Sequence, residues 1–214
     1  MIDIAVVDYG MGNLRSVSKA LEHVAPSKNV VVTSDPAQIS AAERVVFPGQ
    51  GAMPDCMREL DARGVRAAVI DAAANKPFLG ICIGLQLLFE RSEEGDAAGL
   101  GIIPGQVQRF AAADMYDAQG HKLKVPHMGW NQVYQTQPHP LWQGIADGAR
   151  FYHVHSYYVN PVDKTLAAGY SEYPGAFTSA ISRDNIFAVQ FHPEKSQHAG
   201  LQLLSNFVQW DGHL

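Results

Sequence analysis

A cysteine between two glycines is the residue whose setting is most suited to chemistry. The motif Gly80-Ile81-Cys82-Ile83-Gly84 follows an apolar, strand-like run and precedes a helical pattern. The glycines let the backbone turn sharply at this junction, which is the geometry of a nucleophile elbow. A helix beginning there favours the thiolate form of Cys82, and the Ile83 N–H can face an oxyanion. Taken alone, the motif is also typical of a buried structural cysteine, so both interpretations stay open.

A nucleophilic cysteine needs a base, and His192 has the most suitable setting of the nine histidines. It directly follows the strongest strand-like run of the second half, Ile186–Phe191. Along an extended backbone, Glu194 returns to the same face as His192, and Pro193 stiffens the link. A carboxylate on one ring nitrogen leaves the other nitrogen to move a proton. The pattern therefore predicts a Cys82–His192–Glu194 triad, although a solvated histidine at a strand end is the simpler interpretation of His192 alone.

A third motif, Pro48-Gly49-Gln50-Gly51, closes another strand-like run. Ligands of open α/β sheets bind along the carboxyl edge of the strands, where this turn and Cys82 are both expected. Glycines on either side of Gln50 let the backbone approach a substrate or aim an N–H at an oxyanion. As a bare turn, the motif supports a site only together with the other two.

Strand and helix patterns alternate in the first half of the chain and would position these motifs. Helices are predicted over 14–24, from Asp35, in an alanine-rich stretch that ends before Lys76, and over 84–91. The predicted strands are Ile4–Val7, Val30–Val32, Val45–Phe47 and Phe78–Ile81. Such alternation implies an α/β fold, an open and mostly parallel sheet with helices on both faces.

From Val107 onward, short β segments separated by turns replace the alternation. The segments precede a final helix with Leu201, Leu204 and Val208 on one face. They are Gln106–Phe110, Lys122–Val125, Gln132–Gln135, Phe151–Val154, Thr165–Tyr170, Phe177–Ile181 and Ile186–Phe191. We expect them to form a mixed or antiparallel extension of the sheet, so that residues 1–214 make a single domain.

Composition excludes several classes of protein. The 214 residues are 47% hydrophobic and 17% charged, which suits a well-packed core. A net charge of −5 without a basic run argues against nucleic-acid binding. No signal-peptide pattern and no run of roughly 18 apolar residues is present, so neither export nor membrane insertion is expected. Cys56 and Cys82 lie in unlike contexts, which indicates reduced thiols and a cytoplasmic protein.

Together, the three motifs resemble those of the triad-type class I glutamine amidotransferases. Within that family, four further segments are similar to glutaminase subunits of imidazole glycerol phosphate synthases. They are Tyr9–Leu14, Pro126–Asn131, His155–Tyr158 and the continuation into Lys195-Ser196. The resemblance extends from residue 4 to the last helix and implies a flavodoxin-like fold. Gln50 stands where relatives often carry valine, which puts a polar amide beside the expected oxyanion segment.

The resemblance also implies roles for individual residues. Cys82 would attack the carboxamide of glutamine to form a thioester, with His192, oriented by Glu194, as acid and base. The amino-acid end of glutamine would be held by Gln86 and by the main chain around Ser156 and Tyr157. The segment Gly49–Gly51, together with Ile83, would complete the oxyanion hole after a rearrangement. No metal and no cofactor is expected.

Ammonia released next to water becomes ammonium, so a sealed passage to a second active site is expected. The resemblance implies that the partner is a (β/α)₈ cyclase subunit, forming imidazole glycerol phosphate and an aminoimidazole carboxamide ribotide (AICAR) in histidine biosynthesis. We predict a docking face from loops near strand ends, where tryptophan and methionine are typical of interfaces but also of ordinary loop packing. Its residues are Asn13, Met128, Trp130, Asn131 and Lys195.

Several alternatives stay open. A glutaminase subunit can serve another ammonia acceptor, either of the pyridoxal phosphate synthase type, whose Gly-Gly-Glu-Ser segment is absent here, or in a paralogous amidation pathway. A thiol hydrolase and a non-catalytic module with the same fold are other classes. Gly10-Met11-Gly12 lacks the third glycine of a dinucleotide motif. His153 and His155 have no third ligand nearby and are expected to pack rather than to bind metal.

Overall fold

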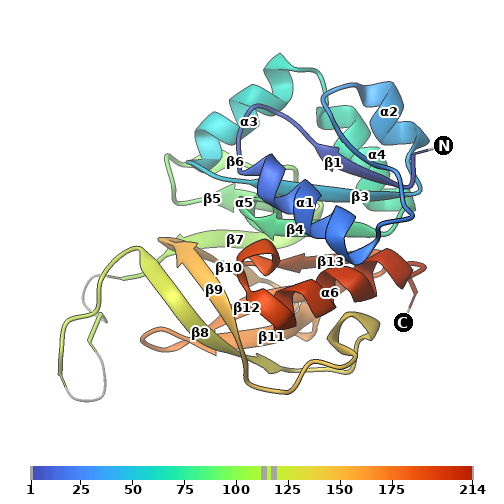
Figure 1. Ribbon diagram of the computed structural model, residues 1–214. Coiled ribbons are helices and arrows are strands. Elements are labelled where there is room, and N and C mark those ends of the chain that lie inside the picture. The colour runs from blue at the N-terminus through green and yellow to red at the C-terminus, as the bar shows by residue number, and fades with distance from the viewer. Residues whose placement is uncertain (1, 112–114, 117–119, 214) are drawn as a thin grey trace.

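A parallel sheet forms the centre of the computed structural model, which describes residues 2–111, 115–116 and 120–213 (Figure 1). The strands lie in the order β2-β1-β3-β4-β13, and each is parallel to its neighbours. They are β1 (Ile4–Val7), β2 (Val30–Thr33), β3 (Arg44–Gly49), β4 (Phe78–Cys82) and β13 (Ile186–Val189). The predicted parallel sheet is confirmed.

Helices cover both faces of this sheet because its strands are apolar on both sides. Ala5 and Phe47 face one layer, and Ile4 and Val46 face the other. The first layer contains α2 (Pro36–Ala41), α3 (Met53–Ala62) and α4 (Arg66–Asn75); the second contains α1 (Leu14–Val24) and α6 (Gln197–Gln209). No helix among the described residues is long and apolar enough to cross a membrane.

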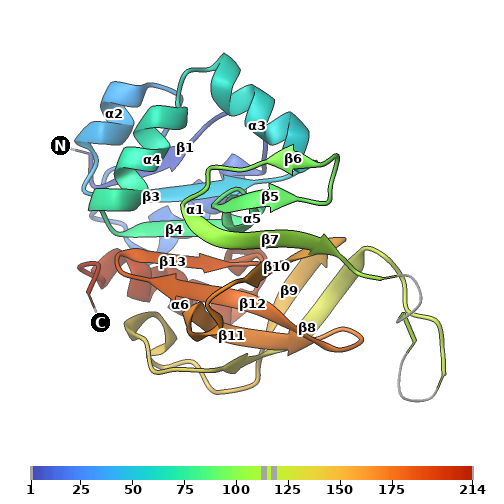
Figure 2. The ribbon, with the colours of Figure 1, turned by 180° about the vertical axis from the view of Figure 1, so that it is seen from behind.

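A mixed, mostly antiparallel extension continues the sheet beyond β13, as predicted, and only β5 and β7 pair in parallel within its described strands (Figure 2). The strand β12 pairs with β13, β10 and β11, and its residue Thr178 is the partner of both Val159 and Tyr170, so the sheet branches there. One branch runs through β10 to β7, β5 and β6, and the other runs through β11 to β8 and β9. The strands are β5 (Phe89–Ser92), β6 (Ala97–Ala98), β7 (Ile103–Arg109), β8 (His127–Gln135), β9 (Ala149–His155), β10 (Tyr157–Pro161), β11 (Ala167–Glu172) and β12 (Ala176–Arg183).

The predicted helix over 84–91 is confirmed only as far as Gln86, and its later part is wrong. A single turn, α5 (Ile83–Gln86), is followed by β5, which pairs with β7 through Phe89 and Ile103. Leu85, Leu87, Leu88 and Phe89 are all fully buried. A continuous apolar run fits a buried helix and a buried strand equally well, and here pairing with β7, which comes later in the chain, decides for the strand.

Other details of the second half also differ from the prediction. The segment Lys122–Val125 forms only a bridge between Lys122 and Tyr116, and β10 was not predicted. The strand predicted over Thr165–Tyr170 begins at Ala167, after the 3₁₀ turn η3 (Lys164–Leu166). The buried face of α6 consists of Gly200, Leu203, Leu204 and Phe207, whereas Leu201 and Val208 are only partly buried. In each case a neighbouring element decides which residues pair or pack. The spacing of residues along the chain carries no information about that neighbour.

Candidate active site

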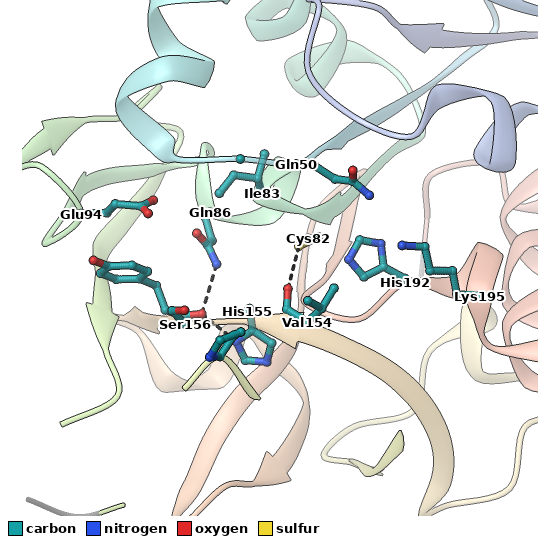
Figure 3. Close-up of a pocket in the computed structure, with 13 residues that line it drawn as sticks. Gln50, Cys82, Ile83, Gln86, Glu94, Val154, His155, Ser156, His192 and Lys195 are labelled. Atoms are coloured by element: carbon teal, nitrogen blue, oxygen red, sulfur yellow. Dashed lines mark hydrogen bonds between the residues drawn. The ribbon is translucent and has the colours of Figure 1, made fainter. Parts of the chain in front are cut away.

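Cys82 lies at the junction of β4 and α5 and lines a cavity of about 440 Å³ (Figure 3). Its φ of 55° and ψ of −109° are strained for a residue with a side chain. The turn is held because α5 packs directly on β3: a Cβ on Gly84 would lie 1.8 Å from the Phe47 oxygen. The sharp strand-to-helix turn predicted from the glycines is therefore present, although the helix after it is a single turn.

His192 reaches the same cavity because β13 is the parallel neighbour of β4. Its Nδ1 donates a hydrogen bond of 2.9 Å to Glu194 Oε1, and both side chains are almost fully buried. The backbone between them is the 3₁₀ turn η4 (Pro193–Lys195), not the extended segment we predicted. The turn is fixed by Ser196, whose hydroxyl donates to the His192 oxygen and accepts the Tyr152 N–H.

The imidazole of His192 faces Cys82 across the cavity, and its Nε2 has no hydrogen-bond partner among the described residues (Figure 3). Burial on its own would lower the pKa of His192. The nearby Cys82 and the Glu194 carboxylate outweigh burial and raise that pKa to about 10. These neighbours favour the protonated form of His192, which can donate a proton from Nε2 into the cavity.

Gln190, which no sequence motif predicted as a site residue, also contacts Cys82. Its side-chain amide lies 3.7 Å from Cys82 Sγ, and its oxygen accepts a hydrogen bond of 3.0 Å from Gln86 Nε2. Gln86 Nε2 also donates to the Tyr157 oxygen, so its amide oxygen is the polar atom left as an acceptor. Gln190 is fully buried just beyond β13, and a polar residue within an otherwise apolar run was the signal available in the sequence.

A directional chain of histidines supports the Tyr157 carbonyl from behind the cavity. His155 Nδ1 donates to the Tyr157 oxygen at 2.7 Å, so His155 Nε2 is an acceptor and receives the His127 Nδ1 hydrogen at 3.2 Å. His127 Nε2 then accepts from the Asn131 amide at 3.3 Å. Burial lowers the pKa of His127 to about 4 and that of His155 to about 3, which keeps both rings neutral.

Other predicted substrate residues are found around the same cavity. Gln50, Gly51, Ile83 and Ser156 line it, and Gly49 is the Cα partner of Cys82 across β3 and β4. The Tyr157 carbonyl already accepts hydrogen bonds from His155 and Gln86. The cavity also contains Glu94, which our sequence analysis missed and whose carboxylate accepts the N–H of Met53. Among the residues that the structure describes, no group of three or more His, Cys, Asp or Glu is placed to hold a metal ion.

Most of the predicted docking residues lie in regular secondary structure, not in loops. Met128, Trp130 and Asn131 lie within β8, so their assignment to loops was wrong. The run Pro126–Asn131 is rich in turn formers, but its pairing with β9 makes it a strand. Met128 is 62% exposed and Trp130 is 43% exposed. Asn13 caps α1, and Lys195 lies in η4 and lines the cavity.

The fold and the site define a class of protein that comparison with known families identifies. Residues 5–210 match the family described as "Glutamine amidotransferase class-I", and the chain belongs to this family. Curated relatives are named imidazole glycerol phosphate synthase subunit HisH. One from Thiobacillus denitrificans is 69% identical and covers 98% of this chain and 92% of its own length. One from Aromatoleum aromaticum is 67% identical and covers 98% of this chain and 99% of its own.

Solved structures share the fold at much lower sequence identity. A putative GMP synthase protein from Thermoplasma acidophilum aligns with a TM-score of 0.68 and 21% identity, over 98% of this chain and 93% of that one. A second structure, described as a glutamine amidotransferase, aligns with a TM-score of 0.67 and 14% identity, over 96% of this chain and 99% of that one. These likenesses confirm the predicted fold class.

Proposed function

We propose that the chain hydrolyses glutamine to glutamate and ammonia, as the glutaminase subunit of an imidazole glycerol phosphate synthase in histidine biosynthesis. The observation that carries this proposal is the cavity shared by Cys82, His192 and Gln86, with Glu194 hydrogen-bonded to His192. Relatives at 58–69% identity carry the name of that subunit. Residues 1–214 would act as one functional domain.

In the first step, the sulfur of Cys82 attacks the side-chain carbonyl carbon of glutamine, and the carbonyl electrons move onto the oxygen. The Ile83 N–H and the Gly49–Gly51 segment would stabilise that oxyanion. When the electrons return, the carbon–nitrogen bond breaks and His192 gives its Nε2 proton to the leaving nitrogen. Ammonia is released and a γ-glutamyl thioester remains on Cys82.

In the second step, water attacks the thioester while the now neutral His192 accepts a proton from it. The carbon–sulfur bond breaks, which releases glutamate and restores Cys82 and the imidazolium. Glu194 holds the same ring nitrogen throughout and keeps the other nitrogen facing the reaction. The Gln86 amide oxygen and the Glu94 carboxylate are acceptors suited to the α-ammonium group of glutamine.

We further propose that a (β/α)₈ cyclase subunit docks over the cavity and receives the ammonia. The exposed Met128 and Trp130 on β8, together with Lys195 at the cavity, support a docking face on this side. Both cysteines are free thiols, which supports a cytoplasmic location.

The test is glutamate release from glutamine by the full chain, with and without the cyclase partner and its nucleotide substrate. We expect turnover that depends on the complex and is abolished by Cys82→Ala, while Cys82→Ala still folds and still binds the cyclase. Esters and peptides, offered as alternative substrates, should not be cleaved. Wild-type turnover in Cys82→Ala, or hydrolysis of esters in preference to glutamine, would refute the proposal.

A further inference from the structure

Two buried side chains that can donate hydrogen bonds lie beneath the Gly49–Gly51 segment, and no step above uses them. Tyr9 follows β1, and Cys56 lies on α3; both are fully buried. Neither lines the active-site cavity, whereas Gln50 and Gly51 do. The segment is thus held between these two residues on one side and the cavity on the other.

Cys56 holds one carbonyl of the segment. Its thiol donates a hydrogen bond of 3.5 Å to the Gln50 oxygen. Burial raises the pKa of Cys56 to about 12, so the sulfur keeps its hydrogen at neutral pH. Because the C=O and N–H of a trans peptide point in opposite directions, this contact turns the Gly51 N–H away from α3.

Tyr9 contacts the same segment at Gly49, one residue before Gln50. A Cβ on Gly49 would lie 1.8 Å from the Tyr9 hydroxyl oxygen and 2.3 Å from Ile83 Cγ2, so only glycine fits. The hydroxyl is fully buried and lies beside the Cys56 thiol, but it makes no hydrogen bond of good geometry in the described part of the chain. Burial raises the pKa of Tyr9 well above its usual value, so the hydroxyl keeps its proton. A buried donor without a partner is unfavourable, and phenylalanine would fill the same space without that penalty.

The backbone beside this hydroxyl has the freedom to turn over. Glycines flank Gln50, and Gly51 already has a φ of +103°. Rotation of the Gly49–Gln50 peptide changes ψ of Gly49 and φ of Gln50 and leaves the carbonyl held by Cys56 in place. With the Gly49 oxygen turned toward Tyr9, the Gln50 N–H points the opposite way, toward the cavity that Gln50 lines.

We infer that Tyr9 and Cys56 are positioning residues for the oxyanion formed during glutamine hydrolysis. Cys56 fixes the Gln50 carbonyl as a pivot, and the Tyr9 hydroxyl donates to the turned Gly49 carbonyl as its partner, which aims the Gln50 N–H at the oxyanion. The inference rests on the proposed glutaminase function and assigns a reason for the unpartnered hydroxyl.

The test is Tyr9→Phe in the complex with the cyclase subunit. We expect kcat for glutamate release to fall about tenfold with KM unchanged, because the oxyanion exists only after attack. Alkylation of Cys82 by iodoacetamide forms no oxyanion and should keep its wild-type rate. The melting temperature should not fall, because the removed hydroxyl makes no hydrogen bond of good geometry in the described part of the folded chain.

Two further sets of variants separate positioning from packing. Cys56→Ala should lower kcat, and Cys56→Ser should restore most of it because serine keeps a donor at the same atom. Ser171→Ala is the matched control: Ser171 is fully buried on β11 and its hydroxyl also lacks a partner among the described residues. This control should keep wild-type kcat.

Wild-type kcat in Tyr9→Phe, or equal loss in Cys56→Ala and Cys56→Ser, would overturn the inference. A parallel fall in kcat and in the alkylation rate would also overturn it, because Tyr9 would then act on Cys82 itself. Failure of the proposed function has a different signature, since the wild-type complex would release no glutamate at all.

Discussion

At the scale of single residues, the site depends on buried polar contacts that each have a defined direction. Glu194 accepts the Nδ1 hydrogen of His192, and Gln190 offers its amide to Cys82 while it accepts from Gln86. The low dielectric around these groups makes each contact strong and makes its loss unfavourable. Replacing one partner is therefore expected to change proton transfer or thiolate formation without removing the cavity.

Glu194→Gln tests the pairing with His192. The variant keeps an acceptor for Nδ1 but removes the charge that helps to raise the pKa of His192. We expect kcat/KM to fall on the order of tenfold to a hundredfold, because the base remains while its orientation and charge support weaken. The alkaline limb of the pH–rate profile should move to lower pH, since the imidazolium is lost at lower pH. An unchanged profile would remove Glu194 from this role.

Gln190→Glu tests the contact with Cys82. Glutamate still accepts from Gln86 but replaces the donor near Cys82 with a negative charge, which disfavours the thiolate. We expect the pH profile of Cys82 alkylation by iodoacetamide to move to higher pH. Glutamine turnover at neutral pH should fall about tenfold. The isosteric change leaves packing intact, which melting temperature checks. An unshifted alkylation profile would contradict the assignment.

At the scale of elements, β8 and β9 bring His127, His153 and His155 together beneath the cavity. The rings of His127 and His153 stack with centroids 4.9 Å apart, and His127 stacks on Tyr173 at 4.0 Å. Burial lowers the pKa of all three histidines, and it also lowers the pKa of His139 to about 4. The packing of these buried rings in the folded chain therefore requires that they stay neutral.

This requirement predicts a loss of stability in mild acid. The folded-state pKa values lie below the unfolded value of about 6.5, so stability is complete above that pH and falls as the unfolded chain takes up protons. Between pH 7.5 and 5, we expect the free energy of unfolding to drop on the order of 2 kcal/mol for each of His127, His139 and His155. Urea unfolding at the two pH values measures the drop.

His127→Gln should reduce that pH dependence because one buried titrating ring is removed. His198→Gln is the control, since His198 is exposed on α6 and should leave the dependence unchanged. If the free energy of unfolding depends equally on pH in wild type and in His127→Gln, protonation of His127 does not destabilise the folded chain, and the prediction is wrong.

At the scale of the whole molecule, the carboxyl ends of β3 and β4 and the residues after β13 converge on the cavity that contains Cys82 (Figure 3). Trp130 lines a neighbouring pocket together with Ser196, the residue that fixes η4. A partner that covers Trp130 and Lys195 would therefore also cover the cavity. Exposed aromatic residues in such positions are typical anchors of interfaces.

Trp130→Ala should weaken binding of the proposed cyclase partner about tenfold or more, as the dissociation constant measured by calorimetry or fluorescence. Turnover coupled to the cyclase reaction should fall in parallel. Ile70→Ala is the matched control because Ile70 is an apolar residue on α4 that is 39% exposed. Unchanged affinity together with unchanged coupled turnover would remove Trp130 from the interface.

The sequence alone determined the features that local rules encode. Apolar runs between helix patterns predicted the parallel sheet, and paired glycines predicted the turn at Cys82. The placement of Glu194 beside His192 was predicted as well, because the two residues are only two positions apart. Even there the backbone proved to be a 3₁₀ turn, which Ser196 stabilises by its bond to Tyr152 of β9 and which no pattern near Pro193 contains.

Only the tertiary structure decided which distant residues meet. Pairing with β7 made the run after Gln86 a strand, and pairing with β9 made the segment around Trp130 a strand, because hydrogen bonds between strands are made by residues far apart in the chain. Gln190 and Tyr9 became candidates in the same way. Gln190 lies within an apolar run, and Tyr9 lies two residues beyond one. The role of each depends on what the fold packs against it: the Cys82 sulfur for Gln190 and the Gly49 backbone for Tyr9.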